Sequence, residues 1–335
     1  MLARSKIDCQ SVSWRRELAT AITRPEELLN TLDLDPKLLP AARAAARRFR
    51  LLVPRGYAAL MQRSDPNDPL LRQVLPLAEE LRDAQGFCTD PVGDHASLRA
   101  PGLLQKYHGR VLLLTSGACA IHCRYCFRRN FSYGKDRVGP ALAAGAIDQI
   151  ARDTSIREIV LSGGDPLMLD DRALADLVRR LGQIPHLRRV RLHTRLPIVL
   201  PSRVTDELCR ALSTSRLAPV LVMHTNHVRE LGAASRSALE QLRNAGITLL
   251  NQSVLLRGVN DDAQQLAALS EALFECSVLP YYLHLLDRVS GAAHFDIDQT
   301  IAVQILDRLR RLLPGYLVPR LVREVPGGSY KIPIY

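Results

Sequence analysis

From about residue 110 onward, short apolar runs with the character of buried β-strands alternate with stretches whose apolar residues recur at helical spacing. The strand-like runs are Arg110–Ser116, Glu158–Ser162, Val190–Thr194, Val220–Thr225, Thr248–Leu256 and Tyr281–Leu286, and the helical stretches lie around 140–153, 170–182, 204–214, 233–245, 261–275 and 297–312. Strands that alternate with helices form a parallel sheet through right-handed crossovers. The pattern therefore predicts six consecutive βα units.

Six such units are typical of an α/β fold, an incomplete TIM-like (βα)6 barrel, whose active site lies at the carboxyl ends of the strands. The first hundred residues show helical patterns separated by proline-rich joints at 38–40 and 65–69. We expect residues 1–100 to form a helical N-terminal cap. Residues 101–335 should form the barrel and a short C-terminal segment.

The composition, with 47% hydrophobic residues among 335, predicts a soluble globular protein with an ample core. Apolar segments are interrupted by Arg, Asp or Pro every few residues, so none predicts a membrane span. Residues 1–8 carry no signal-type apolar stretch, and three of the seven cysteines are clustered. We therefore expect a protein of the reducing cytoplasm.

The formal net charge of +11 invites a nucleic-acid-binding interpretation. The arginines, however, are spread along the chain, and only residues 42–50 predict a basic helix. That stretch has a single aromatic side chain, Phe49, and so offers no series of platforms on which bases could stack; it is better explained as a solvated face. We expect no nucleic-acid partner.

The strongest chemical signal is the trio Cys119, Cys123 and Cys126, which follows the first apolar run with gaps of three and two residues. Ferredoxin sequences supply four cysteines to a four-iron cluster, whereas three thiolates leave one iron with an open coordination position. The alternative is a structural zinc site with His122 as the fourth ligand, although zinc usually binds paired C-x2-C or Cys/His groups. The dispersed cysteines, to which we assign no chemistry, are Cys9, Cys88, Cys209 and Cys276.

Polar residues also mark the ends of other predicted strands, namely Ser162, Gly163, Gly164 and Asp165 after the second, His224 in the fourth, Gln252 in the fifth and Asp287 after the sixth. The two glycines would let a backbone approach a ligand closely, and Asp165 would be available to an ammonium or hydroxyl group. A plain β-turn is the alternative for this segment. His224 and Gln252 are explained equally well as hydrogen-bonded core residues.

Near the C-terminus, Pro326–Ser329 predicts a tight turn shortly before Lys331. Lysine is rare in this chain, with five in total. A lysine that forms a Schiff base is normally held in a constrained and desolvated segment. A frayed, charged tail is the alternative.

Together these motifs resemble the lysine 2,3-aminomutases, which are radical S-adenosylmethionine (SAM) enzymes that also use pyridoxal phosphate (PLP). The resemblance begins near Pro101, ends near Pro333 and rests on residues 106–114, 119–129, 162–167, 192–197, 224–227, 251–260, 281–287, 294–295 and 326–331. It implies an isomerase with a 4Fe–4S cluster, SAM and PLP that converts L-α-lysine to β-lysine.

The resemblance also implies a role for each matching residue. Cys119, Cys123 and Cys126 would bind the cluster, Lys331 would bond to PLP, and Tyr107 and Arg110 would hold the PLP phosphate. Ser162, Gly163, Gly164, Asp165, His224 and Gln252 would line the SAM site, Arg128 would bind the substrate carboxylate, and Asp287 and Glu324 would face the ε-ammonium group.

Two departures narrow the resemblance. Glu324 stands where the family usually has Asp, and the chain reaches Tyr335 without the zinc-binding cysteine segment of the catabolic members. With the form of residues 106–110, these features resemble the subfamily that makes (R)-β-lysine for post-translational modification of elongation factor P. That subfamily implies a reductant such as flavodoxin or ferredoxin, a separate ligase for elongation factor P, and a homodimer.

Several alternatives stay open from the sequence. One is a catabolic lysine 2,3-aminomutase, and another is a radical SAM enzyme that acts on a different amino acid or does not use PLP. The third is a non-catalytic nucleic-acid-binding protein stabilised by zinc or a cluster, against which the dispersed basic residues weigh.

Overall fold

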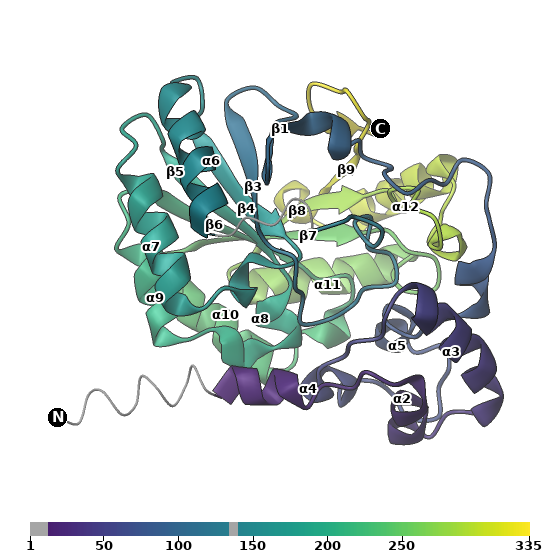
Figure 1. Ribbon diagram of the computed structural model, residues 1–335. Coiled ribbons are helices and arrows are strands. Elements are labelled where there is room, and N and C mark those ends of the chain that lie inside the picture. The colour runs from purple at the N-terminus through teal and green to yellow at the C-terminus, as the bar shows by residue number, and fades with distance from the viewer. Residues whose placement is uncertain (1–12, 134–139) are drawn as a thin grey trace.

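The computed structural model describes residues 13–133 and 140–335, and its centre is one curved sheet (Figure 1). The six expected strands lie side by side in parallel, as β3 (Arg110–Ser116), β4 (Glu158–Gly163), β5 (Arg189–Thr194), β6 (Ala218–His224), β7 (Thr248–Val254) and β8 (Leu279–His284). The predicted alternation of strands and helices is confirmed. Cys9 lies outside the described residues.

A row of leucines crosses five of these strands at one level. Leu113 pairs with Leu161, Leu161 with Leu192, Leu192 with Leu221, and Leu221 with Leu249. Each of the five side chains is at most 3% exposed. Because residues paired in register point to the same side of a sheet, a slip of one residue would move this row to the opposite face. The apolar pattern thus fixes the register of the barrel strands.

Short strands extend the sheet at both edges. β1 (Leu98–Ala100) and β2 (Leu103–Leu104) pair antiparallel next to β3, while β9 (Arg320–Arg323) lies parallel to β8 and β10 (Ile332–Pro333) lies antiparallel to β9. The strand order runs from β1 to β10 without closing, as expected for an incomplete barrel. The boundary expected at residue 100 falls between β1 and β2, so β1 belongs to the sheet.

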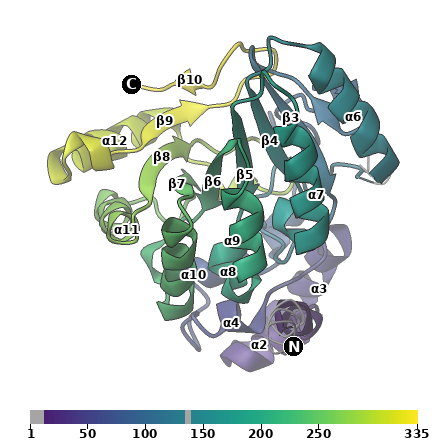
Figure 2. The ribbon, with the colours of Figure 1, turned by 90° about the vertical axis from the view of Figure 1, so that its left-hand side faces the viewer.

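Helices connect the parallel strands along the outer face of the sheet (Figure 2). They are α6 (Pro140–Arg152), α7 (Asp171–Gly182), α8 (Leu196–Val199), α9 (Asp206–Ser213), α10 (Ala233–Asn244), α11 (Ala263–Glu275) and α12 (Gln299–Leu312). The side chains of Asp170, Thr205, Asp262 and Asp298 accept hydrogen bonds from the first-turn amides of α7, α9, α11 and α12 and so begin these helices. Among the described residues, no helix combines the length and apolar composition needed to cross a bilayer.

Short 3-10 turns lie between the longer elements. They are η1 (Pro36–Leu38), η2 (Ala78–Leu81), η3 (His95–Ser97), η4 (Pro166–Met168), η5 (Pro201–Arg203), η6 (Val228–Glu230), η7 (Ala293–Phe295) and η8 (Gly315–Leu317). Two of them matter for the site. Residues at the end of η2 and η6 supply buried carboxylates that face arginines near the ends of the barrel strands.

The N-terminal part shares one hydrophobic core cluster with the barrel. Its helices are a first one that includes residues 13–19, then α2 (Pro25–Leu32), α3 (Leu39–Arg48), α4 (Arg55–Ala58) and α5 (Pro69–Arg72). Its backbone also meets the cysteine loop, which we define as residues 117–133. The amide of His122 donates to the carbonyl of Leu52 at 3.0 Å, and the amide of Arg124 donates to that of Gln73 at 2.8 Å. The N-terminal part therefore supports one side of the cysteine loop.

Glu80 adds a polar tie between the N-terminal part and the cysteine loop. Its carboxylate accepts from Nε of Arg124 at 2.8 Å and from Nη2 at 2.5 Å, and Nη2 of Arg129 reaches the same carboxylate at 2.6 Å. All three side chains are almost fully buried. Such a group of charges is costly to break, because removing one partner leaves the others buried and uncompensated.

Replacing Glu80 by alanine should lower the free energy of unfolding by about 3–5 kcal/mol, because two buried guanidinium groups lose their carboxylate. Glu240→Ala is the control, since its pair with Arg243 is exposed and contributes less than about 1 kcal/mol. Chemical denaturation followed by circular dichroism measures both changes. Equal destabilisation by the two substitutions would contradict this role of Glu80.

Candidate active site

One cavity of about 410 Å³ lies at the carboxyl ends of the barrel strands. Every site residue predicted from the sequence borders it: Tyr107, Arg110, Cys119, Cys123, Cys126, Arg128, Ser162, Gly163, Gly164, Asp165, His224, Gln252, Asp287, Glu324 and Lys331. Residues separated by more than two hundred positions in the chain thus meet in one space. The volume is in the range of small-molecule sites.

The cysteine loop is held against the end of β4 by backbone contacts. The amide of Gly164 donates to the Ser116 carbonyl at 2.7 Å, and the amide of Asp165 donates to the Ala118 carbonyl at 2.8 Å. A Cβ atom on Gly163 or Gly164 would stand 2.3 Å from one of these two carbonyl oxygens. The glycines are therefore required by the close approach of the cysteine loop. From the sequence, we expected a ligand to make this close approach.

The three thiols are half-buried at the cavity, and thiolates at these positions would repel one another. Burial raises the pKa of Cys119 well above its usual value and that of Cys126 to about 11, and the neighbouring sulfurs raise both further. Thiolates at these positions need a cationic partner, which the irons of a cluster supply. The donor set thus fits a 4Fe–4S cluster.

The zinc alternative can be compared with the surroundings of His122. Nδ1 of this ring lies 2.9 Å from the Arg50 carbonyl, and the ring stacks on Phe49. Within residues 13–133 and 140–335, no three His, Cys, Asp or Glu side chains gather as ligands of a single metal ion would. A 4Fe–4S cluster does not need such a group, because each thiolate binds a different iron.

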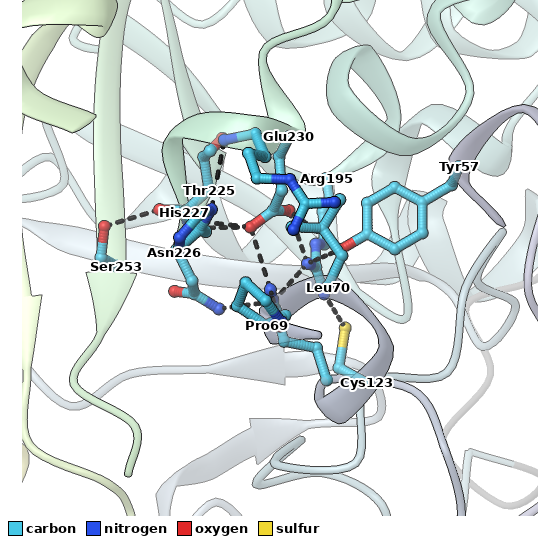
Figure 3. Close-up of polar contacts among 12 residues, drawn as sticks. Tyr57, Pro69, Leu70, Cys123, Arg195, Thr225, Asn226, His227, Glu230 and Ser253 are labelled. Carbon is cyan, nitrogen blue, oxygen red and sulfur yellow. Dashed lines mark hydrogen bonds and ion pairs between the residues drawn. The ribbon is translucent and has the colours of Figure 1, made fainter. Parts of the chain in front are cut away.

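Cys123 is in contact with a buried arginine that follows β5. Nη1 of Arg195 lies 2.7 Å from the Cys123 sulfur, and Nη2 lies 2.7 Å from Oε2 of Glu230 (Figure 3). The same Nη2 also donates to Oε1 of Gln73 at 2.6 Å and to the Tyr57 hydroxyl at 3.1 Å. The guanidinium group thus connects a predicted cluster ligand with both the N-terminal part and η6.

Asp165 borders the cavity, yet its carboxylate is occupied by its own surroundings. It accepts from the Thr194 hydroxyl at 2.8 and 2.9 Å, from the Arg195 amide at 2.8 Å and from the Leu167 amide at 3.0 Å. Burial raises its pKa to about 6, against the effect of these donors. The expectation that Asp165 would be available to an ammonium or hydroxyl group is therefore not what the structure shows. The carboxylate orders the turn after β4.

His224 and Gln252 are partners of each other. Nε2 of Gln252 lies 2.6 Å from Nε2 of His224, across the neighbouring strands β6 and β7. Burial lowers the pKa of His224 to about 3, helped by the positive charges of Arg195 and Lys331. The imidazole is therefore neutral and accepts a hydrogen bond at physiological pH. Both residues line the cavity.

A chain of alternating charges lines the opposite end of the cavity. The ammonium group of Lys331 pairs with Glu324, whose other oxygen lies 3.3 Å from Nζ of Lys106. Nζ of Lys106 also lies 2.8 Å from Asp94, and Asp94 accepts from Nε of Arg128 at 2.6 Å. Arg128 in turn donates from Nη1 to the Ser162 hydroxyl at 3.1 Å. This chain links the lysine end of the cavity to the cysteine end.

Asp287 stands apart from that chain but faces the same space. Burial raises the pKa of its carboxyl group to about 7, an effect that the Lys331 charge opposes and the Glu324 charge increases. Its charge therefore changes near neutral pH. A cation that enters this end of the cavity would be attracted by Glu324 and would favour ionisation of Asp287.

The lysine end also carries donors suited to an anionic cofactor. The Arg110 guanidinium lies 4.5 Å from the centre of the Tyr107 ring. Among the described residues, no hydrogen-bond partner reaches the buried Nε atoms of Arg110 and Arg191, or Nε2 of His193 and His284. Buried polar nitrogens without partners are costly, and a phosphate with several acceptor oxygens would satisfy them. These residues and Lys331 fit PLP.

Several of these cavity residues were not expected from the sequence. Asp94 lies in an irregular segment before the barrel, and no local pattern identifies it. Arg191 and His193 alternate along β5, which has neighbouring strands on both sides. Polar residues at alternate positions of a central parallel strand were the available signal, because such strands are normally apolar on both faces.

Comparisons with known proteins agree with this geometry. Residues 113–269 match the sequence model of the Radical SAM superfamily. Over 323 residues the chain is 48% identical to the L-lysine 2,3-aminomutase of Escherichia coli (strain K12), with 96% of this chain and 94% of the relative covered. It is 36% identical to the L-lysine 2,3-aminomutase of Clostridium subterminale, with coverages of 96% and 77%. It is 32% identical to the glutamate 2,3-aminomutase of Clostridioides difficile (strain 630), with coverages of 98% and 77%.

Proposed function

Because the chain belongs to the lysine 2,3-aminomutase family of radical SAM enzymes, we propose that it converts L-α-lysine to (R)-β-lysine. One observation carries the proposal. A single cavity has three half-buried thiols at one end and, at the other, Lys331 beside Asp287 and Glu324. A cluster, a Schiff-base lysine and a site for a cationic side chain are what such a reaction on lysine requires.

The chain is an isomerase, and its cofactors are a 4Fe–4S cluster, SAM and PLP. Cys119, Cys123 and Cys126 would bind the cluster, and the turn after β4 with His224 and Gln252 would border SAM. Lys331, Tyr107 and Arg110 would hold PLP, with Arg191, His193 and His284 close by. When bound, the cluster and SAM supply a carbon-centred radical, and PLP supplies a conjugated ring that stabilises the migrating nitrogen.

The contacts of Glu324 support the position of the substrate ε-ammonium group. Glu324 already pairs with the ammonium group of Lys331. With Lys331 engaged in holding PLP, Glu324 and Asp287 would be available to pair with the substrate ammonium group. An ammonium group can enter so buried a site only if carboxylates compensate its charge. The same two carboxylates disfavour glutamate, whose side chain is anionic.

Arg128 is the residue proposed for the substrate α-carboxylate. Its Nε and Nη1 contacts with Asp94 and Ser162 fix the plane of the guanidinium group between the two ends of the cavity. A planar, always-charged group held in this way is suited to binding a carboxylate. The substrate would thereby be bound at its α-carboxylate by Arg128 and at its ε-ammonium group by Glu324 and Asp287, with the β-carbon between them.

We also propose that the product is used, through a separate ligase, to modify elongation factor P in the cytoplasm. The form of residues 106–110 supports this over a catabolic role. A flavodoxin or ferredoxin would reduce the cluster, since the reaction needs a low-potential electron. A homodimer rests on the family resemblance alone.

Anaerobic incubation of the reconstituted protein with SAM, PLP, dithionite and L-lysine should yield β-lysine, separated from α-lysine by chromatography on a chiral phase. Cys126→Ala and Lys331→Ala should each reduce the yield to background, because each removes a residue that holds a cofactor. L-Glutamate is the control substrate and should be returned unchanged. Cleavage of SAM without any change in lysine would assign the cavity to another amino acid, and (S)-β-lysine would refute the stereochemical proposal.

The value of kcat/KM for lysine should rise about tenfold between pH 6 and pH 8, because the Asp287 carboxyl group, with a pKa of about 7, must be ionised to pair with the ε-ammonium group. The positive charge of Lys331 lowers the pKa of Asp287. If PLP takes up the Lys331 nitrogen, that charge is lost and the pKa of Asp287 is higher, so kcat/KM should still rise with pH. Asp287→Asn should lower kcat/KM and flatten the profile in this range. A pH profile that is the same in both proteins would contradict the role of Asp287.

A further inference from the structure

A polar cluster extends from Cys123 and Arg195, at the wall of the cavity, into the buried interior (Figure 3). We define the Arg195 cluster as Tyr57, Gln73, Cys123, Arg195 and Glu230. Arg195 is 6% exposed and Glu230 is 0% exposed, so their charges act in an environment almost without water. Charges act more strongly there than at a surface, because little solvent screens them.

We propose that Arg195 tunes the reduction potential of the cluster through its contact with the Cys123 sulfur, and that Glu230 opposes this effect. Arg195 is thus a positioning and tuning residue and need not touch the substrate. The proposal rests on the proposed function only in taking Cys119, Cys123 and Cys126 as ligands of a 4Fe–4S cluster.

The contact is direct and charged. Nη1 of Arg195 lies 2.7 Å from the Cys123 sulfur, whereas Nη2 lies 3.1 Å from the Tyr57 hydroxyl. Among the contacts of the described residues, no side-chain nitrogen donates to the sulfur of Cys119 or Cys126. Cys123 is therefore the ligand through which a guanidinium charge would act on the cluster.

Glu230 does not fully cancel that charge, because its carboxylate is shared. Its Oε2 faces Arg195, whereas Oε1 accepts from Nε2 of Gln73 at 3.1 Å and from the amides of Asn226 and His227 at 2.9 and 3.0 Å. These three donors draw the negative charge away from the guanidinium group. A net positive potential at the Cys123 sulfur follows.

The direction of the effect follows from the charge of the two cluster states. Reduction adds one electron from an external reductant, dithionite in the test below, and lowers the charge of the 4Fe–4S core from 2+ to 1+. Hydrogen bonds to cluster sulfurs and nearby positive charge stabilise the more negative, reduced state and so raise the potential. Arg195 should raise the potential, and Glu230 should lower it.

The test is an anaerobic redox titration of the reconstituted protein with dithionite, read by the electron paramagnetic resonance signal of the reduced cluster. At the same solution potential, Arg195→Gln should lower the ratio of reduced to oxidised cluster about tenfold. For a one-electron couple this corresponds to a reduction potential lower by about 59 mV. Glu230→Gln should move the potential in the opposite direction. Iron and sulfide content per chain shows that each variant carries a full cluster.

Two further variants separate charge from structure. Tyr57→Phe removes one hydrogen bond of the same guanidinium group and the hydrogen bond from the Tyr57 hydroxyl to Oε2 of Glu230 at 3.3 Å, without changing any charge, and its potential should shift by much less than that of Arg195→Gln. Arg195→Lys keeps the positive charge, so the reduction potential of its cluster should lie close to that of the unchanged protein, although an ammonium group cannot make the forked contacts. Arg195→Gln should still fold, because Glu230 retains the donors at its Oε1 atom.

Opposite shifts in Arg195→Gln and Glu230→Gln support the proposal, because a purely structural role would alter stability in both but would not move the potential in opposite directions. Equal potentials in Arg195→Gln and the unchanged protein, at full iron content, would overturn it. Shifts in the same direction would overturn it as well. The titration contains no lysine, so an absence of β-lysine in the turnover assay contradicts the proposed function without affecting this result.

Discussion

Pairing of buried guanidinium groups with carboxylates from distant parts of the chain determines where the cysteine loop lies. Arg124 and Arg129 within the loop share Glu80, and Arg128 pairs with Asp94. Arg195, which follows β5 and contacts Cys123, pairs with Glu230. Leaving one of these charges buried without its partner costs several kcal/mol. The loop therefore adopts its position only when the N-terminal part and the barrel are both folded.

The same constraint shapes the other end of the cavity, with a different consequence. There the paired cations are lysines rather than arginines, and Glu324 contacts both Lys106 and Lys331. An ammonium group is a compact point charge that can be exchanged for another, whereas a forked guanidinium contact is specific in geometry. The arginine pairs thus fix the cluster end. The lysine pairs at the other end leave room for exchange with PLP and substrate.

The barrel strands and the motifs at their ends could be predicted because local patterns encode them, whereas Tyr107, Arg110, Arg128 and Glu324 were expected from the family resemblance alone. The apolar runs predicted all six strands, and their leucines pair in register across the sheet. The cysteine, Gly-Gly and Lys331 motifs each lie at a strand end or a turn. The contacts between motifs could not be predicted. Asp94 pairs with Arg128 across 34 positions, and Arg195 reaches Cys123 across 72. Such pairings depend on how the strands curve, and no local pattern specifies that curvature. For the same reason, Asp165 was expected to face a ligand but instead orders its own turn.

The central claim is that the cluster end and the lysine end of one cavity act on the same substrate molecule. Incubation of the reduced, reconstituted protein with PLP, unlabelled SAM and L-lysine deuterated at the β-carbon tests it most directly, with mass spectrometry of both SAM and lysine. The account predicts deuterium in the 5′-methylene group of SAM and a matching loss from the β-lysine formed. If β-lysine forms while all deuterium stays in the amino acid and SAM remains unlabelled, the two ends of the cavity do not act together and the account is wrong.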